Sequence, residues 1–289
     1  MKYQRIGVVG AGVIGIGVIQ DLAQTGHDVV VIDLDNRILE SAVQTLRRNV
    51  RLHHLVAGTG QPLNVTEVLA RIRFGTDLAL LQDRQIVVEN VTEDWDVKQP
   101  LYEKLDTLCD PAAVFAANTS IIPISKIASA TSRPPKVVGM HFMNPVPLKP
   151  VVEVIRGRQT SDGTIETANQ FLNQLGKTAI VVNDSPGFVS NRVLMLTINE
   201  AALVVEEGVA PAEDVDAIFR DCFGHSMGPL ATADLIGLDT ILRSIEGLQH
   251  EFQDEKYKPS PLLQKMVAAG KLGRKSGEGF FSYGPLTRN

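Results

Sequence analysis

The chain has 289 residues, of which 44% are hydrophobic and 21% charged, and its formal net charge is −5. This length allows two domains with cores of their own, and the composition is ordinary for a globular protein. The mildly negative charge argues against nucleic acid or an acidic membrane as a partner, and no run approaches the ~20 apolar residues of a membrane span. The two cysteines, Cys109 and Cys222, form no C-x-x-C pair. That argues against a disulfide framework or a cysteine-based metal site and favours a reducing, cytoplasmic compartment.

Residues 5–33 carry the most informative pattern of the chain. An apolar run ends in glycines spaced G-x-G-x-x-G, and a helical pattern and a second apolar run follow. Glycines at this spacing allow a tight turn, a close approach of backbone N–H groups to a pyrophosphate, and close packing of helix on strand. The start of the helix adds partial positive charge and unpaired donors for phosphate groups. The predicted dinucleotide-binding loop contains Gly10, Gly12, Val13, Ile14 and Gly15.

The acid that ends the second apolar run indicates which dinucleotide binds. Asp33 is placed to accept hydrogen bonds from the hydroxyls of the adenosine ribose. It would repel a 2′-phosphate, and Leu34 and Asp35 bring no compensating cation, although Arg37 is near. The pattern therefore predicts NAD rather than NADP.

Short apolar runs alternate with amphipathic stretches as far as residue 182. We predict helices at 36–55, 65–70, 95–108 and 165–175, and strands at 71–74, 85–89, 114–117, 137–140, 151–155 and 178–182. Strands that alternate with helices indicate an α/β fold with a doubly wound sheet of the Rossmann type.

The pattern changes at the Asp-Ser-Pro-Gly segment of residues 184–187. Helical periodicity dominates afterwards, at 188–207, 212–222, 232–248 and 261–269, with one possible short strand near Phe280. We therefore expect a nucleotide-binding domain over residues 1–185 and a smaller all-helical domain over residues 186–289.

One histidine stands where a base for alcohol oxidation could act. His141 follows the apolar run 137–140, and Glu153 lies twelve residues later in a predicted returning strand. A carboxylate behind an imidazole fixes its tautomer and stabilises the imidazolium formed on proton uptake. The pair therefore fits a general base, although a histidine near a strand end is often structural.

Two further polar sites, the segment 118–120 and Asn191, allow either a functional or a structural interpretation. Asn118, Thr119 and Ser120 follow a strand at the edge where α/β sheets bind ligands, or they form a turn that caps the helix near Ile124. Asn191 falls at the start of the first helix of the second domain, where it either contacts substrate or caps the helix.

Taken together, these segments resemble a known family over nearly the whole chain. The segments are GAGVIGIG, NTS, HFMNPVP, VVEVI, DSPGFVSNR, HSMGPLATADLIGLD and GKLGRKSGEGFFSYG. In this order they are similar to the 3-hydroxyacyl-CoA dehydrogenase family in its single-function short form. The resemblance implies NAD-dependent oxidation of an L-3-hydroxyacyl thioester of short chain, such as 3-hydroxybutyryl-CoA, to the 3-ketoacyl thioester, or the reverse.

The resemblance also implies roles for individual residues. His141 would be the catalytic base, Glu153 the carboxylate that orients it, and Asn191 a substrate contact. Ser120 would bond the substrate oxygen and approach the nicotinamide. The positions that match further cofactor contacts of the family are Glu93, Lys98, Asn144 and Lys275. Members of the family are usually homodimers through the helical domain.

The segment after Asp33 leaves the acyl carrier open. In family members that use acyl-CoA, lysines here meet the nucleotide end of CoA, whereas this chain has Arg47, Arg48 and Arg51 and then no Lys or Arg from 52 to 70. Either the three arginines suffice, or the acyl group is carried on an acyl carrier protein. The sequence is also compatible with a free hydroxy or sugar acid as substrate, and with a non-catalytic NAD(H)-binding protein.

Overall fold

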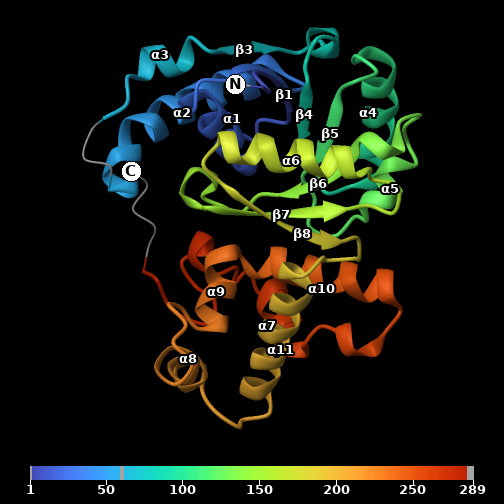
Figure 1. Cartoon of the computed structure of the whole chain (residues 1–289). Coiled ribbons are helices and arrows are strands. Elements are labelled where there is room, and N and C mark those ends of the chain that lie inside the picture. Colours follow the sequence, from blue (N-terminus) through green and yellow to red (C-terminus); the bar gives the residue numbers. More distant parts are fainter. Residues whose placement is uncertain (1, 59–61, 285–289) are drawn as a thin grey trace. The chain divides into compact units, whose positions relative to one another are not determined.

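The computed structural model describes residues 2–58 and 62–284. The chain divides into two compact units, residues 1–185 and 186–289, of which the first is α/β and the second helical (Figure 1). No helix within the described ranges is long and apolar enough to cross a bilayer.

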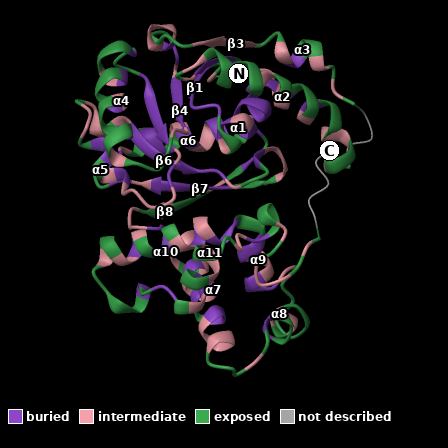
Figure 2. Ribbon diagram, turned by 180° about the vertical axis from the view of Figure 1, so that it is seen from behind, coloured by how far each residue is buried: buried purple, intermediate pink, exposed green. Residues whose placement is uncertain are grey.

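The described part of the first unit is built on one eight-stranded sheet. Its strands are β1 (Arg5–Val9), β2 (Asp28–Ile32), β3 (Ile72–Gly75), β4 (Ile86–Glu89), β5 (Val114–Ala117), β6 (Val137–His141), β7 (Val151–Arg156) and β8 (Thr178–Asn183). They lie in the order β3-β2-β1-β4-β5-β6-β7-β8. All neighbours from β3 to β6 pair in parallel, whereas β7 runs antiparallel to β6 and parallel to β8. The central strands β1, β4 and β6 are buried (Figure 2), which explains their continuous apolar sequences.

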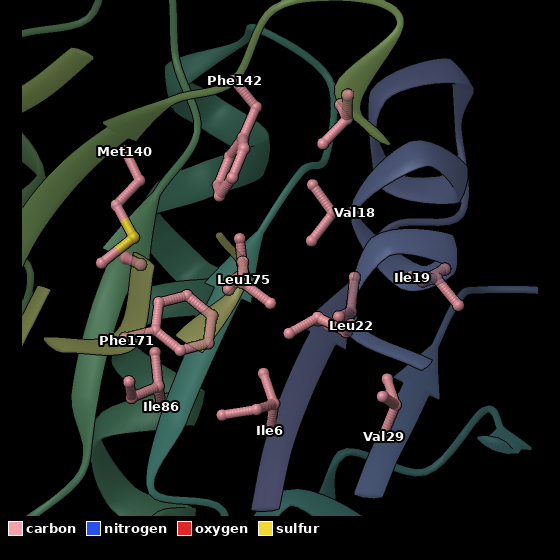
Figure 3. Close-up of a cluster of buried hydrophobic side chains, with 14 of the residues drawn as sticks. Ile6, Val18, Ile19, Leu22, Val29, Ile86, Met140, Phe142, Phe171 and Leu175 are labelled. Carbon is pink, nitrogen blue, oxygen red and sulfur yellow. The ribbon is translucent and has the colours of Figure 1, made fainter. Parts of the chain in front are cut away.

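Helices cover both faces of this sheet. They are α1 (Val13–Gln24), α2 (Asn36–Ala57), α3 (Val65–Leu69), α4 (Trp95–Leu108), α5 (Ile124–Ala128) and α6 (Asp162–Gln174), with 3₁₀ turns η1 (Leu78–Leu81), η2 (Pro134–Lys136) and η3 (Val146–Leu148). Helices α1, α2 and α6 share one buried cluster with the strands, and Figure 3 shows Val18 and Leu22 of α1 pointing towards Phe171 of α6. On the other face, Tyr102 of α4 meets Phe115 of β5 edge to face, with ring centroids 6.1 Å apart.

Local signals explain where these helices begin and end. Helix α2 begins after Asp35, whose side chain accepts the Arg37 N–H, and ends at Gly58 in the left-handed conformation. Residues 59–61, which follow this helix, lie outside the described residues. Helix α6 begins earlier than the apolar pattern predicts, because the Ser161 side chain accepts the Thr164 N–H and caps it.

The second unit is a helical bundle with its own core. Its elements are α7 (Ser190–Glu206), α8 (Ala212–Asp221), α9 (Pro229–Ile236), α10 (Leu238–Phe252), η4 (Glu255–Tyr257), α11 (Pro261–Ala268) and η5 (Arg274–Ser276). Apolar side chains of α7, α9, α10 and α11 form one buried cluster, which includes Ile198, Ala233, Ile245 and Leu263.

Three predictions in this unit differ from the structure. The single helix predicted over 232–248 is wrong: Gly237, with φ of 107°, separates α9 from α10, and α9 already begins at Pro229. Helix α7 begins at Ser190 rather than at Phe188, because Phe188 has a φ of 52° that a helix cannot continue. Near Phe280 the described chain forms no strand but only isolated bridges, in which Glu278 pairs with Gly273 and with Ser282.

Candidate active site

The carboxyl ends of β4, β5 and β6 are joined by one side chain. The Asn118 amide donates to Asn90 Oδ1 at 2.9 Å, and Asn118 Oδ1 accepts the Phe142 N–H at 3.1 Å. Because parallel strands end at the same edge of a sheet, the loops that follow them lie together here.

His141 and Glu153 form the predicted pair. They lie directly opposite each other in the antiparallel ladder of β6 and β7, and His141 Nδ1 is 3.1 Å from Glu153 Oε2. Their side chains are only 6% and 10% exposed, so the carboxylate interacts with little screening by water. A proton on Nδ1 that is donated to Glu153 leaves Nε2 as the acceptor.

Ser120 meets the other nitrogen of the same ring. Its Oγ lies 3.1 Å from His141 Nε2, so hydroxyl, imidazole and carboxylate follow one another in line. The Asn118–Ser120 segment does not cap α5, because Asp184 accepts the Ile124 N–H there. The structural interpretation of this segment as a cap is therefore wrong.

The glycines of the first loop match the requirements of a dinucleotide. Gly10 has a φ of 93°, and a Cβ there would lie 2.7 Å from the Asn90 carbonyl oxygen. A Cβ on Gly15 would lie 2.0 Å from the Gly10 carbonyl oxygen, whereas one on Gly12 would meet no described atom within 4 Å. Gly12 is the N-cap of α1 and offers no side-chain cap, and Val13, the first residue of the helix, is 74% exposed. The loop thus leaves backbone donors and open space for a pyrophosphate.

Asp33 and its neighbours fit NAD. Asp33 accepts the Ala11 N–H at 2.7 Å and the Leu34 N–H at 2.7 Å, which places its carboxylate beside the glycine loop. Arg37, the cation that follows in the sequence, is bound to Asp35 at 2.6 Å, and its side-chain hydrogen bond is the largest cause of the lowered pKa of Asp35. Arg37 is therefore already paired with Asp35, so the Asp33 carboxylate would meet the ribose of a bound cofactor without Arg37 as a compensating charge.

The structure places the Lys98 side chain in the interior, whereas the family resemblance implies that Lys98 contacts the cofactor. Its side chain is fully buried, and its ammonium donates to Glu89 at 2.7 and 2.8 Å. Glu89 also accepts a hydrogen bond from the Tyr102 hydroxyl at 3.0 Å. Burial raises the pKa of Glu89, and the charge of Lys98 opposes that shift. The ammonium also donates to the carbonyls of Val91 and Asn118 at 3.5 and 3.4 Å, so from this position Lys98 would affect the cofactor through Glu89 and these two segments.

Sequence reasoning missed that Glu89 and Tyr102 complete the buried network around Lys98. Glu89 ends an otherwise apolar strand, IVVE, and Lys98 follows nine positions later. An acid inside a buried strand is rare unless it is paired, so this spacing was an available signal.

The other predicted site residues lie in separate segments. Glu93 contacts the loop that carries Ser120, and Asn144 is exposed in the loop after β6, next to a cis peptide bond with Pro145. Asn191 is the second residue of α7, and Lys275 lies in η5, where its ammonium binds Asp239.

Comparison with known proteins decides the family. Residues 5–185 match the family described as "3-hydroxyacyl-CoA dehydrogenase, NAD binding domain", and residues 187–283 match "3-hydroxyacyl-CoA dehydrogenase, C-terminal domain". The chain belongs to the 3-hydroxyacyl-CoA dehydrogenase family. As a member it is an oxidoreductase that depends on NAD, so the predicted family, α/β fold and cofactor are confirmed.

Relatives match the chain over nearly its full length. A probable 3-hydroxybutyryl-CoA dehydrogenase of Deinococcus radiodurans is 48% identical over 96% of the chain and all of its own length. The crystal structure of FadB2 of Mycobacterium tuberculosis has a TM-score of 0.93 at 40% identity and covers 97% of this chain and 99% of its own. That of (S)-3-hydroxybutyryl-CoA dehydrogenase of Ralstonia eutropha has a TM-score of 0.91 at 42% identity and covers 98% of this chain and 100% of its own.

Proposed function

We propose that this dehydrogenase oxidises the hydroxyl group of a short-chain L-3-hydroxyacyl-CoA, or reduces the 3-keto group in reverse, with His141 as the general base. The observation that carries the proposal is the line of Ser120 Oγ, His141 and Glu153, with 3.1 Å at each step. The names of the Deinococcus and Ralstonia relatives support a four-carbon acyl group, and the Ralstonia name supports the (S) configuration.

The three side chains supply the proton chemistry. His141 Nε2 takes the proton of the substrate hydroxyl, while Ser120 Oγ hydrogen-bonds the same oxygen. Glu153 stabilises the imidazolium that results, and in reduction that imidazolium returns the proton. Bound NAD supplies the hydride acceptor. We assign substrate binding to Asn191 as well, and cofactor contacts to Glu93, Asn144 and Lys275.

A His141→Gln variant tests this assignment. We expect turnover to fall by about 10²–10⁴-fold, the usual size of a general-base contribution, while NADH affinity stays near normal because the glycine loop is untouched. Steady-state kinetics and NADH fluorescence titration measure the two quantities.

His250→Gln, at the exposed end of α10, is the matched control and should behave as wild type. A His141→Gln enzyme with nearly normal turnover would rule out the base. Glu153→Gln should also lower turnover and move its pH profile, and an unchanged profile would separate Glu153 from the base.

We further propose that the acyl group is carried by CoA. On the last turns of α2, Arg47, Arg48 and Arg51 are exposed, and within the described residues their side chains form no ion pair. Three unpaired guanidinium groups on one helix suit the anionic phosphates of the CoA nucleotide.

Matched thioesters distinguish the carriers. We expect the 3-hydroxybutyryl group to be oxidised with a lower KM on CoA than on acyl carrier protein, and an Arg47→Gln/Arg48→Gln/Arg51→Gln variant to lose that advantage. Preference for the carrier-protein thioester would favour acyl carrier protein as the carrier, and turnover of free 3-hydroxybutyrate would favour a hydroxy-acid enzyme. NADH binding without turnover of any substrate would favour a non-catalytic NAD(H)-binding protein.

A homodimer assembled through the helical unit and a cytoplasmic location complete the proposal. Large apolar side chains of that unit are exposed to solvent in the single chain: Val193, Val209, Ile218, Phe223, Leu235 and Ile236. Exposed apolar groups on one domain support an interface between copies. The location rests on the two unpaired cysteines alone.

A further inference from the structure

Residues 119–125 form the loop after β5 together with the start of α5, and this loop segment carries Ser120 and directs its backbone donors at two carboxylates. Its donors are the N–H groups of Ser120, Ile121, Ile122, Ile124 and Ser125, because Pro123 has none. Successive N–H groups in a turn form a concavity that attracts anions. Here Glu93 and Asp184 of the same chain supply the negative charge.

Glu93 binds the first half of this loop. Its carboxylate accepts the N–H groups of Ser120, Ile121 and Ile122 at 3.2, 3.3 and 3.2 Å, and the Thr119 hydroxyl donates to it as well. Glu93 follows β4, so it fixes the loop from the neighbouring strand of the sheet.

Asp184 binds the second half. Its Oδ1 accepts the Ile124 N–H at 2.9 Å, and its Oδ2 accepts the Ser125 N–H at 2.7 Å and the Ser125 hydroxyl at 2.6 Å. Asp184, which follows β8, is itself anchored, because its N–H donates at 3.0 Å to the carbonyl of Arg156, the last residue of β7. The Ser125 Oγ also accepts the Arg158 N–H at 2.8 Å. The loop is thus tied to β7 and β8 as well as to β4.

We propose that Asp184 is a positioning residue for the dehydrogenase reaction, which together with Glu93 holds the loop so that Ser120 Oγ stays within hydrogen-bonding distance of His141 Nε2. Hydrogen bonds to a carboxylate are about twice as strong as neutral ones, so two carboxylates restrain a short loop from both ends. Displacement of a reacting group by about 1 Å can cost about 10²-fold in rate. The inference rests on the role proposed for Ser120 above.

An Asp184→Asn variant tests the proposal. The amide keeps one acceptor but turns its NH₂ group towards either the donor of Ile124 or the donors of Ser125, because these residues donate to different carboxylate oxygens. We expect kcat to fall by about 10- to 100-fold, with the KM for NAD nearly unchanged because the glycine loop is not involved. In the enzyme without cofactor, amide hydrogen exchange of the peptide that spans residues 119–126 should accelerate.

A double-mutant cycle separates positioning from a merely structural role. If Asp184 acts through Ser120, Asp184→Asn should lower kcat little further once Ser120→Ala is present. Losses that multiply would overturn the proposal, as would an Asp184→Asn enzyme that is fully active per folded molecule. If Asp184→Asn folds poorly, Ser125→Ala removes one of the same hydrogen bonds, and its expected loss is about fivefold.

Asp216→Asn is the matched control. Asp216 accepts the N–H groups of Leu230 and Ala231 at 2.9 and 2.8 Å, so it caps α9 in the second unit as Asp184 caps α5. Its loss should lower stability and leave kcat per folded molecule near normal. Because His141→Gln is measured beside these variants, an active Asp184→Asn enzyme with an inactive His141→Gln enzyme would refute the positioning role alone, whereas activity in both would refute the base assignment too.

Discussion

Two buried lysines show how single charges are accommodated in the nucleotide-binding unit. Lys98 binds Glu89 directly, whereas Lys177 lies 3.1 Å from Asp21 Oδ2 and aims its hydrogen bonds at the carbonyls of Val146 and Lys149, both at 2.7 Å. Asp21 is therefore buried with an incomplete set of partners. Burial raises the pKa of Asp21 to about 6, and the charge and hydrogen bond of Lys177 only partly oppose that shift.

This shift predicts a pH-dependent contribution of Asp21 to stability. The folded-state pKa of about 6 exceeds the ordinary value of 3.8, so the contribution is greatest below pH 3.8 and is lost as the pH rises through 6. Asp21→Asn does not titrate. The difference in unfolding free energy, wild type minus variant, should therefore fall by about 1 kcal/mol between pH 5 and pH 7.5, as urea denaturation at each pH can measure. A difference that is flat or rises with pH would contradict the shift.

At the scale of elements, two glycines in the turn from β1 into α1 serve different purposes, Gly15 in packing and Gly12 in cofactor binding. Gly15 packs against the Gly10 carbonyl, so a side chain there would collide with backbone. Gly12 faces open space in the described chain, so a side chain there would collide with a bound cofactor rather than with the protein. The two positions therefore separate stability from cofactor affinity.

Alanine substitutions at the two glycines should affect different properties, stability at Gly15 and affinity for NAD at Gly12. Gly15→Ala should lower the unfolding free energy by about 1–3 kcal/mol, the cost of overpacking. Gly12→Ala should leave it within about 0.5 kcal/mol. The KM for NAD should nevertheless rise about tenfold or more in Gly12→Ala, because the backbone can no longer approach the pyrophosphate. Thermal or urea unfolding and steady-state kinetics provide the two readouts, and a Gly12→Ala enzyme with normal KM would place the pyrophosphate elsewhere.

At the scale of the whole molecule, the helical unit exposes several large apolar side chains to solvent. Phe223 is 66% exposed and meets Phe219 edge to face, with ring centroids 5.6 Å apart, and Val209 is 71% exposed. Contact with a second copy would remove these groups from water.

We expect the protein to sediment at twice the mass of its 31.4 kDa chain. Val209→Asp/Phe223→Asp should shift it towards the monomer, because a buried unpaired charge weakens an interface. Val97→Asp, at an exposed position on α4 of the nucleotide-binding unit, is the matched control and should leave the mass unchanged. A wild-type chain that sediments as a monomer would remove the basis for the interface.

The sequence by itself determined the features that depend on short-range pattern. The glycine spacing, the acid after the second strand and the alternation of strands and helices predicted the Rossmann-type sheet and NAD, since each needs only neighbouring residues to be recognised. The pairing of His141 with Glu153 was also within reach, because a strand, a proline-rich turn and a returning strand bring residues twelve positions apart face to face.

Only the tertiary structure decided the contacts between segments far apart in the chain. Asp184 meets Ile124 across sixty positions, and nothing in either segment marks the other as its partner. Lys98 matches a cofactor contact by motif, yet its ammonium lies in the interior because Glu89 needs a counter-charge there. Pattern is local, whereas hydrogen-bond and charge satisfaction in a folded chain depends on which strands the sheet places side by side.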